Sequence, residues 1–212
     1  MDQIWKAAGI PLWVKPYEIL ATGPNCGLIE VVSDALSIHS IKEKIGPNSL
    51  IVDYFRIQFG AAKSDRGKKA KDNFCNSLAA YSLVCYILQI KDRHNGNILL
   101  DIEGHLVHID FGFLLSNAPG KGVKLETAPF KLTQEMIDVL GGQDSNKFDE
   151  FRKRMAKGFH ALQENAEKII ILVEMMLNGQ SDLPCFIGGR NLVRELKDRL
   201  FPNQRRMTQV EC

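Results

Sequence analysis

The residues with the clearest chemical meaning in this sequence form two short polar runs that lie close together. The first is Asp92-Arg93-His94-Asn95-Gly96-Asn97, and the second is Asp110-Phe111-Gly112. Transfer of a phosphoryl group needs a carboxylate beside the acceptor hydroxyl and oxygen ligands for the Mg²⁺ that accompanies the nucleotide. Asp92, Asn97 and Asp110 can supply these groups, so the two runs together indicate a phosphotransfer site.

The spacing of these residues supports this interpretation. Four residues separate Asp92 from Asn97, as they separate the catalytic Asp from the metal-binding Asn in protein kinases. The stretch from Asn97 to Asp110 holds two apolar segments around Glu103-Gly104, a pattern that predicts a β-hairpin.

The register of that hairpin follows from its turn. With Glu103-Gly104 as a two-residue turn, Asn97 stands directly opposite Asp110. Opposed residues have Cβ atoms about 4.5–5.5 Å apart, so the amide and the carboxylate are expected to share one Mg²⁺ ion. The alternative is an ordinary surface hairpin that carries carboxylates near its turn.

The composition indicates one domain and argues against some partners. The chain has 212 residues, of which 45% are hydrophobic, which is enough for one core. A net charge of +2 gives no support for a nucleic-acid partner. Five widely spaced cysteines without a C-x-x-C pair predict reduced, intracellular thiols. The apolar runs are too short for a membrane span, so any membrane contact is expected to be peripheral.

Other patterns predict the elements that position the two polar runs. Residues 11–20 and 27–32 are expected to form the strands of a hairpin. An apolar helix is predicted over residues 72–90 and would end just before Asp92. The basic stretch 63–71 is expected to be a solvated loop, with contact to anionic lipid as the alternative.

Further helices are predicted after the second run. Thr133 is expected to cap one helix, which Gly141-Gly142 ends. Residues 146–178 predict a helix in two pieces with a break at Gly158, and residues 192–200 predict the last helix. This order of strands, a helical body with a catalytic hairpin, and more helices is that of the lower lobe of a kinase.

Three segments carry a resemblance to a known family. The order Asp92-Arg93-His94 inverts the His-Arg-Asp of protein kinases, and in this the chain resembles the phosphatidylinositol 3- and 4-kinase superfamily. The similarity covers nearly the whole chain and is closest to the type III beta branch of the phosphatidylinositol 4-kinases. The segments that carry it are Pro11–Tyr17, Leu88–Leu100 and Leu183–Phe186.

The resemblance implies a fold and its divisions. The expected fold class is α+β, that of a protein-kinase-like lipid kinase, with a mainly helical C-lobe, a catalytic β-hairpin and a remnant of the N-lobe sheet. Residues 1–32 would form the end of the N-lobe with the hinge, and residues 33–212 the C-lobe. The C-lobe would hold a catalytic loop at 91–97, a metal motif at 110–112 and an activation loop at 110–129.

The resemblance also implies the nucleotide site. Residues 27–32 are similar to the hinge, so Glu30 and Val32 would bind adenine through their backbones, unless this segment is only a packed strand edge. Leu99 and Ile109 would form the apolar floor under the base. Asn97 and Asp110 would bind Mg²⁺, with Mn²⁺ as an alternative ion, and ATP would be the phosphate donor.

Asp92 and His94 are the candidates for orienting and deprotonating the inositol hydroxyl. Asp92 occupies the position of the protein-kinase base, whereas His94 is a candidate because the unperturbed pKa of a histidine side chain, about 6.5, is near neutrality. The sequence leaves the division of labour between them open.

The activation loop suggests the lipid substrate. Its middle part has only two cations, Lys121 and Lys124, whereas the related 3-kinases have a loop much richer in Lys and Arg. A phosphate monoester would need such partners to offset its desolvation. We therefore expect unphosphorylated phosphatidylinositol as the substrate and phosphatidylinositol 4-phosphate as the product. Family members act at the cytoplasmic side of intracellular membranes, and the resemblance implies a location at the Golgi. It also implies regulatory protein partners, which the sequence does not identify.

The chain also departs from the pattern of a complete kinase. No phosphate-cradling glycine loop and no upper-lobe lysine is recognisable before residue 27. We therefore expect a partial catalytic domain that by itself turns over ATP poorly. The alternative is a catalytically inactive module that binds a protein or a membrane, because loss of an upper lobe would expose apolar surface.

Overall fold

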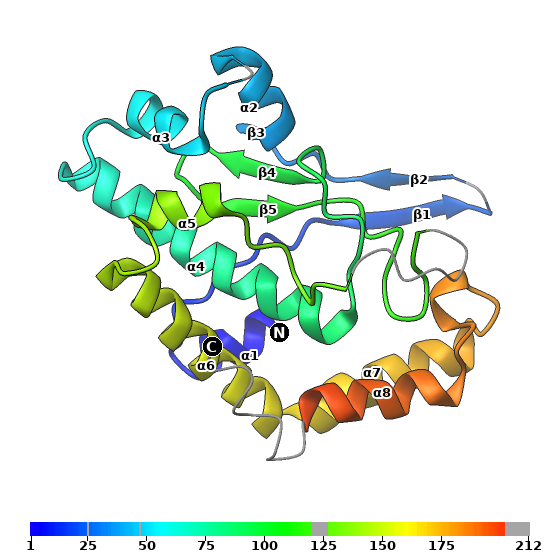
Figure 1. Ribbon diagram of the computed structural model, residues 1–212. Coiled ribbons are helices and arrows are strands. Elements are labelled where there is room, and N and C mark those ends of the chain that lie inside the picture. Colours follow the sequence, from blue (N-terminus) through cyan, green and yellow to red (C-terminus); the bar gives the residue numbers. More distant parts are fainter. Residues whose placement is uncertain (25, 47, 120–126, 202–212) are drawn as a thin grey trace.

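The longest helix in the described part of the structure, α4 (Asp65–Leu88), lies at the centre of the fold (Figure 1). The computed structural model describes residues 1–24, 26–46, 48–119 and 127–201. The hydroxyl of Ser64 starts α4 by accepting the N–H of Gly67 at 3.1 Å. The helix ends where Gln89 adopts a left-handed conformation. Because residues 74–83 are almost all buried, α4 forms the centre of the hydrophobic core.

The predicted helix is confirmed over residues 72–88 but begins earlier than expected. Most of the basic stretch 63–71, predicted to be a loop, is the exposed first part of α4. The sequence pattern missed these turns because they carry charged residues and Gly67 instead of a regular apolar period. Gly67 is required by packing, since a Cβ there would lie 2.4 Å from the carbonyl oxygen of Ala61.

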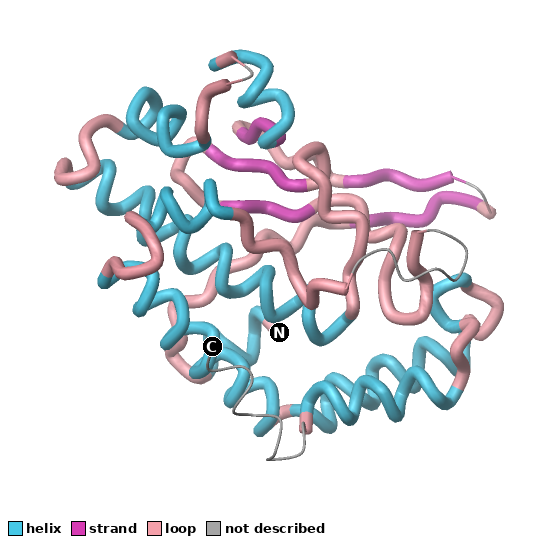
Figure 2. Tube along the Cα trace, in the orientation of Figure 1, coloured by secondary structure: helices cyan, strands magenta, loops and turns pink. Residues whose placement is uncertain are grey.

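Two antiparallel sheets lie above α4 in the view of Figure 2. The three-stranded sheet has the order β3 (Ala35–Ser37), β4 (Ile98–Asp101) and β5 (Leu106–His108). A separate hairpin consists of β1 (Ile19–Gly23) and β2 (Cys26–Ile29). A hairpin near the N-terminus is thus present as predicted, but the bounds of its first strand were wrong, because residues 11–18 have no regular structure and β1 begins at Ile19.

The β4–β5 hairpin is present, but the predicted register was wrong by one residue. Ile98 pairs with His108, and the N–H of Ile109 donates to the carbonyl of Asn97 at 3.1 Å. Asn97 therefore stands opposite Ile109 instead of Asp110. The reason is the turn, which contains three residues, 102–104, and places Gly104 at φ +93°.

One side of α4 holds the hairpin along its length. At the tip of the hairpin, Gly104 lies against Ala70, and Asn73 Nδ2 donates to the carbonyl of Glu103 at 2.8 Å. In the middle, Ser77 Oγ accepts the N–H of Leu106 at 2.8 Å. At the open end, the ring of Tyr81 stacks on the ring of His108 with centroids 4.5 Å apart. The four helix residues are three or four positions apart, the spacing of neighbours on one helix face. Helix α4 therefore fixes where the hairpin lies.

Within residues 127–201, the described part of the chain after the activation loop, four further helices follow the hairpin. They are α5 (Gln134–Leu140), α6 (Asn146–Glu164), α7 (Ala166–Gly179) and α8 (Arg190–Leu200), with a 3-10 turn at Pro184–Phe186. Thr133 caps α5 and Gly141 ends it, as predicted. The break between α6 and α7 lies at Asn165, and the prediction of a break at Gly158 was wrong. None of the helices described in the structure has the length and apolar character to cross a bilayer.

Gly158 is a packing glycine under the N-terminal helix α1 (Asp2–Ala7). The indole Nε1 of Trp5 donates to the carbonyl of Gly158 at 3.0 Å, and Trp5 is fully buried. A Cβ on Gly158 would lie 2.2 Å from Leu12 Cδ1.

Two other helices, α2 (Ile38–Ile45) and α3 (Ile51–Phe59), were not predicted. Helix α3 packs on α4 through an edge contact between the rings of Phe55 and Phe74.

We predict that Gly104→Ala destabilises the fold more than Gly142→Ala does. Both glycines have positive φ, which costs a non-glycine residue about 1–2 kcal/mol. At Gly142 the space is open, whereas a Cβ on Gly104 would lie 2.7 Å from the carbonyl oxygen of Ala70. We expect a loss of about 1 kcal/mol at Gly142 and about 3 kcal/mol at Gly104, measured by urea unfolding. Equal losses would contradict the contact between hairpin and helix.

Candidate active site

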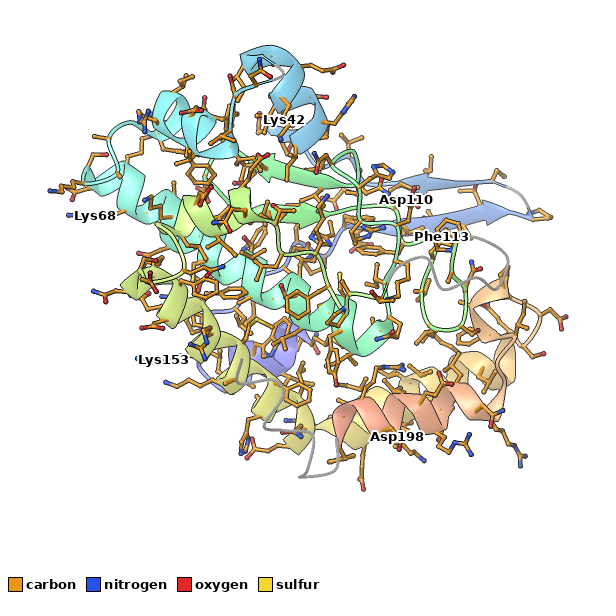
Figure 3. The ribbon with its side chains drawn as sticks, in the orientation of Figure 1. Lys42, Lys68, Asp110, Phe113, Lys153 and Asp198 are labelled. Atoms are coloured by element: carbon orange, nitrogen blue, oxygen red, sulfur yellow. The ribbon has the colours of Figure 1, made fainter. Side chains whose placement is uncertain are left out.

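The end of α4 brings the two polar runs together. The N–H of Lys91 donates to the carbonyl of Phe113 at 2.9 Å, and the N–H of Leu115 donates to the carbonyl of Leu88 at 2.8 Å. The chain leaving α4 thus runs beside the chain leaving β5, near the labelled residues Asp110 and Phe113 in Figure 3. Loop 91–97 and motif 110–112 are therefore neighbours in space.

Arg93 joins the two runs directly. Its side chain is buried, with the residue only 6% exposed. The guanidinium donates from Nε to the carbonyl of Lys91 at 3.0 Å, from Nη1 to that of Ile109 at 2.7 Å, and from Nη2 to that of Asp110. It also lies over the ring of Phe111, 5.6 Å from the centroid. One side chain thus holds both sides of the site, although the sequence analysis gave it no role.

Two carboxylates of the site sit on unusual backbone. Asp92 and Asp110 have φ values of 59° and 57°, in the left-handed region. Such a conformation costs a residue with a side chain about 1–2 kcal/mol and occurs most often at functional sites. Because β5 ends at His108 and Asp110 is left-handed, the alternation of side chains along β5 does not decide where the Asp110 carboxylate points.

Asn97 and Asp110 have side chains that suit a divalent cation. Asn97 is buried, and its Nδ2 donates to the carbonyl of Asp92 at 3.0 Å, which leaves its amide oxygen available as a ligand. Asp110 is exposed, and one of its carboxylate oxygens accepts the N–H of Gly112 at 3.2 Å. No cluster of three or more His, Cys, Asp or Glu in the described ranges could hold a metal alone. An amide and one carboxylate fit Mg²⁺ that takes its remaining ligands from phosphates.

The ring of His94 has a defined tautomer in this arrangement. Its Nδ1 accepts the N–H of Gly96 at 3.0 Å, so in the neutral ring the proton lies on Nε2. Nε2 is 4.0 Å from Oδ2 of Asp92. Gly96 permits this contact, because a Cβ there would lie 2.9 Å from Cε1 of His94. The neutral His94 therefore presents a donor, and Asp92 presents an acceptor.

A second histidine near the site is kept neutral. His108 is buried between the ring of Tyr81 and the thiol of Cys85, whose Sγ is 3.6 Å from Nδ1. Burial, followed by the nearby charge of Arg93, lowers the pKa of His108 to about 3. His108 therefore serves in packing and does not exchange protons near neutral pH.

Strand β4 alternates between buried and half-buried residues, whereas all of β5 is buried, including Val107, which pairs with Leu99. Ile98, Leu100 and Leu106 face the core and are at most 1% exposed. Leu99 and Ile109 lie on the other face by strand alternation and are only half-buried. Leu99 and Ile109 thus keep part of their apolar surface accessible near Asn97, which is compatible with the predicted floor for a base next to the metal ligands.

The predicted hinge residues lie where β2 leads towards β3. Glu30 is exposed, and its N–H donates to the carbonyl of Glu18 at 2.8 Å. The N–H of Glu18 and then the ammonium of Lys15 lower the pKa of the Glu30 carboxylate. Val32 is half-buried. Since the N–H of Glu30 is engaged, a contact with adenine would have to use its carbonyl.

The two predicted substrate lysines, Lys121 and Lys124, lie outside the described residues. The end of the activation loop is described, and it returns to loop 91–97. Lys91 Nζ donates to the carbonyl of Ala128 at 3.4 Å, and Lys131 Nζ donates to Oδ1 of Asn95 at 2.8 Å. Lys131 is thus a further cation beside the site, to which the sequence alone assigned no role there.

Comparisons with known proteins identify similar sequences. A family model described as phosphatidylinositol 3- and 4-kinase matches residues 1–184. The chain is 46% identical to a phosphatidylinositol 4-kinase of Dictyostelium discoideum, 49% to phosphatidylinositol 4-kinase PIK1alpha of Candida albicans, and 46% to phosphatidylinositol 4-kinase beta of Danio rerio. Each match covers 94% of this chain but only 17%, 22% and 23% of these relatives. The chain thus spans about a fifth of their length.

We predict that Arg93→Lys weakens Mg²⁺-dependent ATP binding by about tenfold or more, in this chain or in a longer protein that contains it. A lysine keeps the charge but cannot hold three carbonyls at fixed angles, and hydrogen bonds to a charged group contribute about 1.5–3 kcal/mol each. Calorimetric titration with and without Mg²⁺ measures the effect. Arg56→Lys, the same change on the exposed surface of α3, is the control. Unchanged binding in Arg93→Lys would show that Arg93 does not hold the site.

Proposed function

The chain belongs to the phosphatidylinositol 3- and 4-kinase family, as the sequence predicted, and from this we propose that it carries the catalytic centre of a lipid kinase. This centre transfers the γ-phosphoryl group of ATP to the inositol ring of phosphatidylinositol. The single observation that carries the proposal is the bonding of Arg93 to the carbonyls of Ile109 and Asp110, because it joins a catalytic loop to a metal motif.

Asn97 and Asp110 are the residues proposed to hold Mg²⁺, or Mn²⁺ in its place. The ion would neutralise the phosphates of ATP and draw charge from the leaving group. The protein contributes rigidity, since the Asn97 amide is fixed by the carbonyl of Asp92 and the Asp110 backbone is held by Arg93. Leu99 and Ile109 would lie under the adenine, while Glu30 and Val32 would bind its edge.

Asp92 is proposed as the group that orients and deprotonates the inositol hydroxyl. The unprotonated nitrogen of a neutral His94 is occupied by the N–H of Gly96, so His94 cannot take a proton there without losing that bond. Its Nε2–H can instead donate to the incoming hydroxyl or phosphate. This geometry favours Asp92 as the base and His94 as a donor.

The 4-position of the ring is the finer part of the proposal. It is supported by the names of the relatives and by the small number of lysines in the activation loop, Lys121 and Lys124. The substrate is a membrane lipid, so we propose peripheral contact with the cytoplasmic side of an intracellular membrane. The Golgi as its location and the existence of regulatory protein partners come from the family resemblance alone.

A second function is favoured by the β1–β2 hairpin. Its large side chains Leu20, Leu28 and Ile29 are 61%, 64% and 65% exposed, and the following Val31 is 82% exposed. An exposed apolar sheet of this kind fits a module that binds a protein or a membrane without catalysis. Titration with ATP and Mg²⁺ separates the two functions, because only the kinase requires nucleotide affinity.

We predict that Asp110→Ala and Asn97→Ala each lower lipid phosphorylation at least about a hundredfold in a protein that contains this chain. Loss of a preorganised charge-stabilising group costs about that much in other enzymes. Incorporation of labelled phosphate into phosphatidylinositol measures the effect, and analysis of the product identifies the ring position. Asp144→Ala, which removes an exposed carboxylate outside the site, serves as the control. Activity retained in Asp110→Ala would refute the metal role.

We predict that substitution of each residue distinguishes the two candidate bases, with kcat for lipid phosphorylation as the measurement. With Asp92 as the base, His94→Gln keeps part of the activity, and Asp92→Asn removes nearly all of it. With His94 as the base, His94→Gln is as inactive as Asp92→Asn. The second result would overturn the proposed roles.

A further inference from the structure

The outer side of α7 exposes an unusual amount of apolar surface. The inner side of this helix buries Ile169, Ile170 and Val173. Four large side chains on the outer side are about half exposed or more, and two others follow in the loop at 180–189. We call this set the α7 surface, and it consists of Ile171, Leu172, Met175, Met176, Leu183 and Ile187, with exposures of 52%, 60%, 64%, 49%, 42% and 79%. Several large apolar side chains exposed on one side of a helix and in the loop that follows it suit an interaction site.

The loop part of the α7 surface is bonded to the activation loop. Ser116, which follows the metal motif, donates from its hydroxyl to the carbonyl of Cys185 at 2.7 Å. In return, the N–H of Gly188 donates to the hydroxyl of Ser116 at 3.3 Å. Leu183 and Ile187 lie within two residues of Cys185. Whatever binds these two side chains is therefore brought next to the loop proposed to receive the lipid.

Basic residues lie on α8, the helix that packs on α7. Arg190 and Arg194 are exposed in the first turns of α8 and line an open cavity of about 490 Å³ between α7 and α8. Neither makes an ion pair within the described ranges, whereas Lys197 beside them pairs with Glu174 at 3.5 Å. Exposed apolar side chains and arginines on two packed helices match the interface of a bilayer that carries anionic lipid.

We propose that the α7 surface is where the chain docks on an anionic bilayer. Its apolar side chains enter the headgroup region, and Arg190 and Arg194 meet the lipid phosphates. The bonds through Ser116 then hold the activation loop at the membrane. This inference rests on the proposed lipid kinase function, because it assigns the orientation in which that site meets its substrate.

The other basic surface is placed less well for this task. The exposed lysines at the start of α4 include Lys68, which lies at the opposite end of the molecule from Asp110 and Phe113 in Figure 3. Docking through Lys68 and Lys69 would leave the site distant from the membrane. These residues therefore supply the matched controls for the α7 surface.

Sedimentation of the 212-residue chain with vesicles tests the proposal. The vesicles contain phosphatidylcholine and phosphatidylserine, without phosphatidylinositol or ATP. We expect Leu183→Ser with Ile187→Ser to lower binding about tenfold, since exposed side chains are lost that would otherwise enter the interface. Arg190→Gln with Arg194→Gln is expected to lower it similarly and to remove the preference for phosphatidylserine.

The controls repeat the same chemical changes elsewhere. Ile57→Ser alters a side chain of α3 that is 73% exposed, and Lys68→Gln with Lys69→Gln removes two charges at the far end. Both are expected to bind vesicles as the wild type does. Absence of vesicle binding by the wild type, or an equal loss in the controls, would overturn the proposal. Concentration-dependent dimers that disappear in the Leu183 and Ile187 variant would also overturn it, in favour of a second copy as the occupant.

Failure of docking and failure of the kinase function are distinguishable. Asp110→Ala should still bind the vesicles, because the α7 surface is intact. The variant of Leu183 and Ile187 should still phosphorylate a short-chain, water-soluble phosphatidylinositol in a protein that contains this chain. Vesicle binding without any lipid phosphorylation would leave docking correct and the proposed function wrong.

Discussion

The hydrogen bonds of the buried Arg93 guanidinium are the constraint on which the site depends. A buried cation must satisfy its donors, and here three backbone carbonyls accept them, from Lys91, Ile109 and Asp110. Those carbonyls belong to segments on both sides of the hairpin, so satisfying Arg93 also fixes how the segments meet. The two left-handed aspartates can persist because the surrounding bonds determine their backbone.

Much of the fold could be predicted from local patterns, and the errors have identifiable physical causes. The caps at Thr133 and Gly141 and the apolar half of α4 follow rules of sequence alone. The hairpin was predictable, but its register was not. The sequence is compatible with a two-residue turn at 103–104 and with a three-residue turn at 102–104, and the structure has the second. Gly158 reads as a helix break in sequence, yet in three dimensions it makes room for Leu12 and Trp5.

In the candidate site, too, some features could be predicted from the sequence and others could not. The spacing of Asp92, Asn97 and Asp110 pointed to one site, and the structure brings loop 91–97 beside motif 110–112. Nothing in the spacing distinguishes Arg93 as the residue that joins them, because that role appears only when distant carbonyls converge. The tautomer of His94 likewise depends on a backbone N–H two residues later, a contact that a list of residue types does not contain.

The α4 residues that contact the hairpin, from Ala70 to Tyr81, limit how the length of this helix can change in related sequences. Each residue of an α-helix is turned by about 100° from the one before it. Loss or gain of one residue between Ala70 and Tyr81 would therefore rotate Asn73, Ser77 or Tyr81 away from the strand that each one contacts. Substitutions in this stretch that keep its length leave the row of contacts aligned, whereas a change in its length does not.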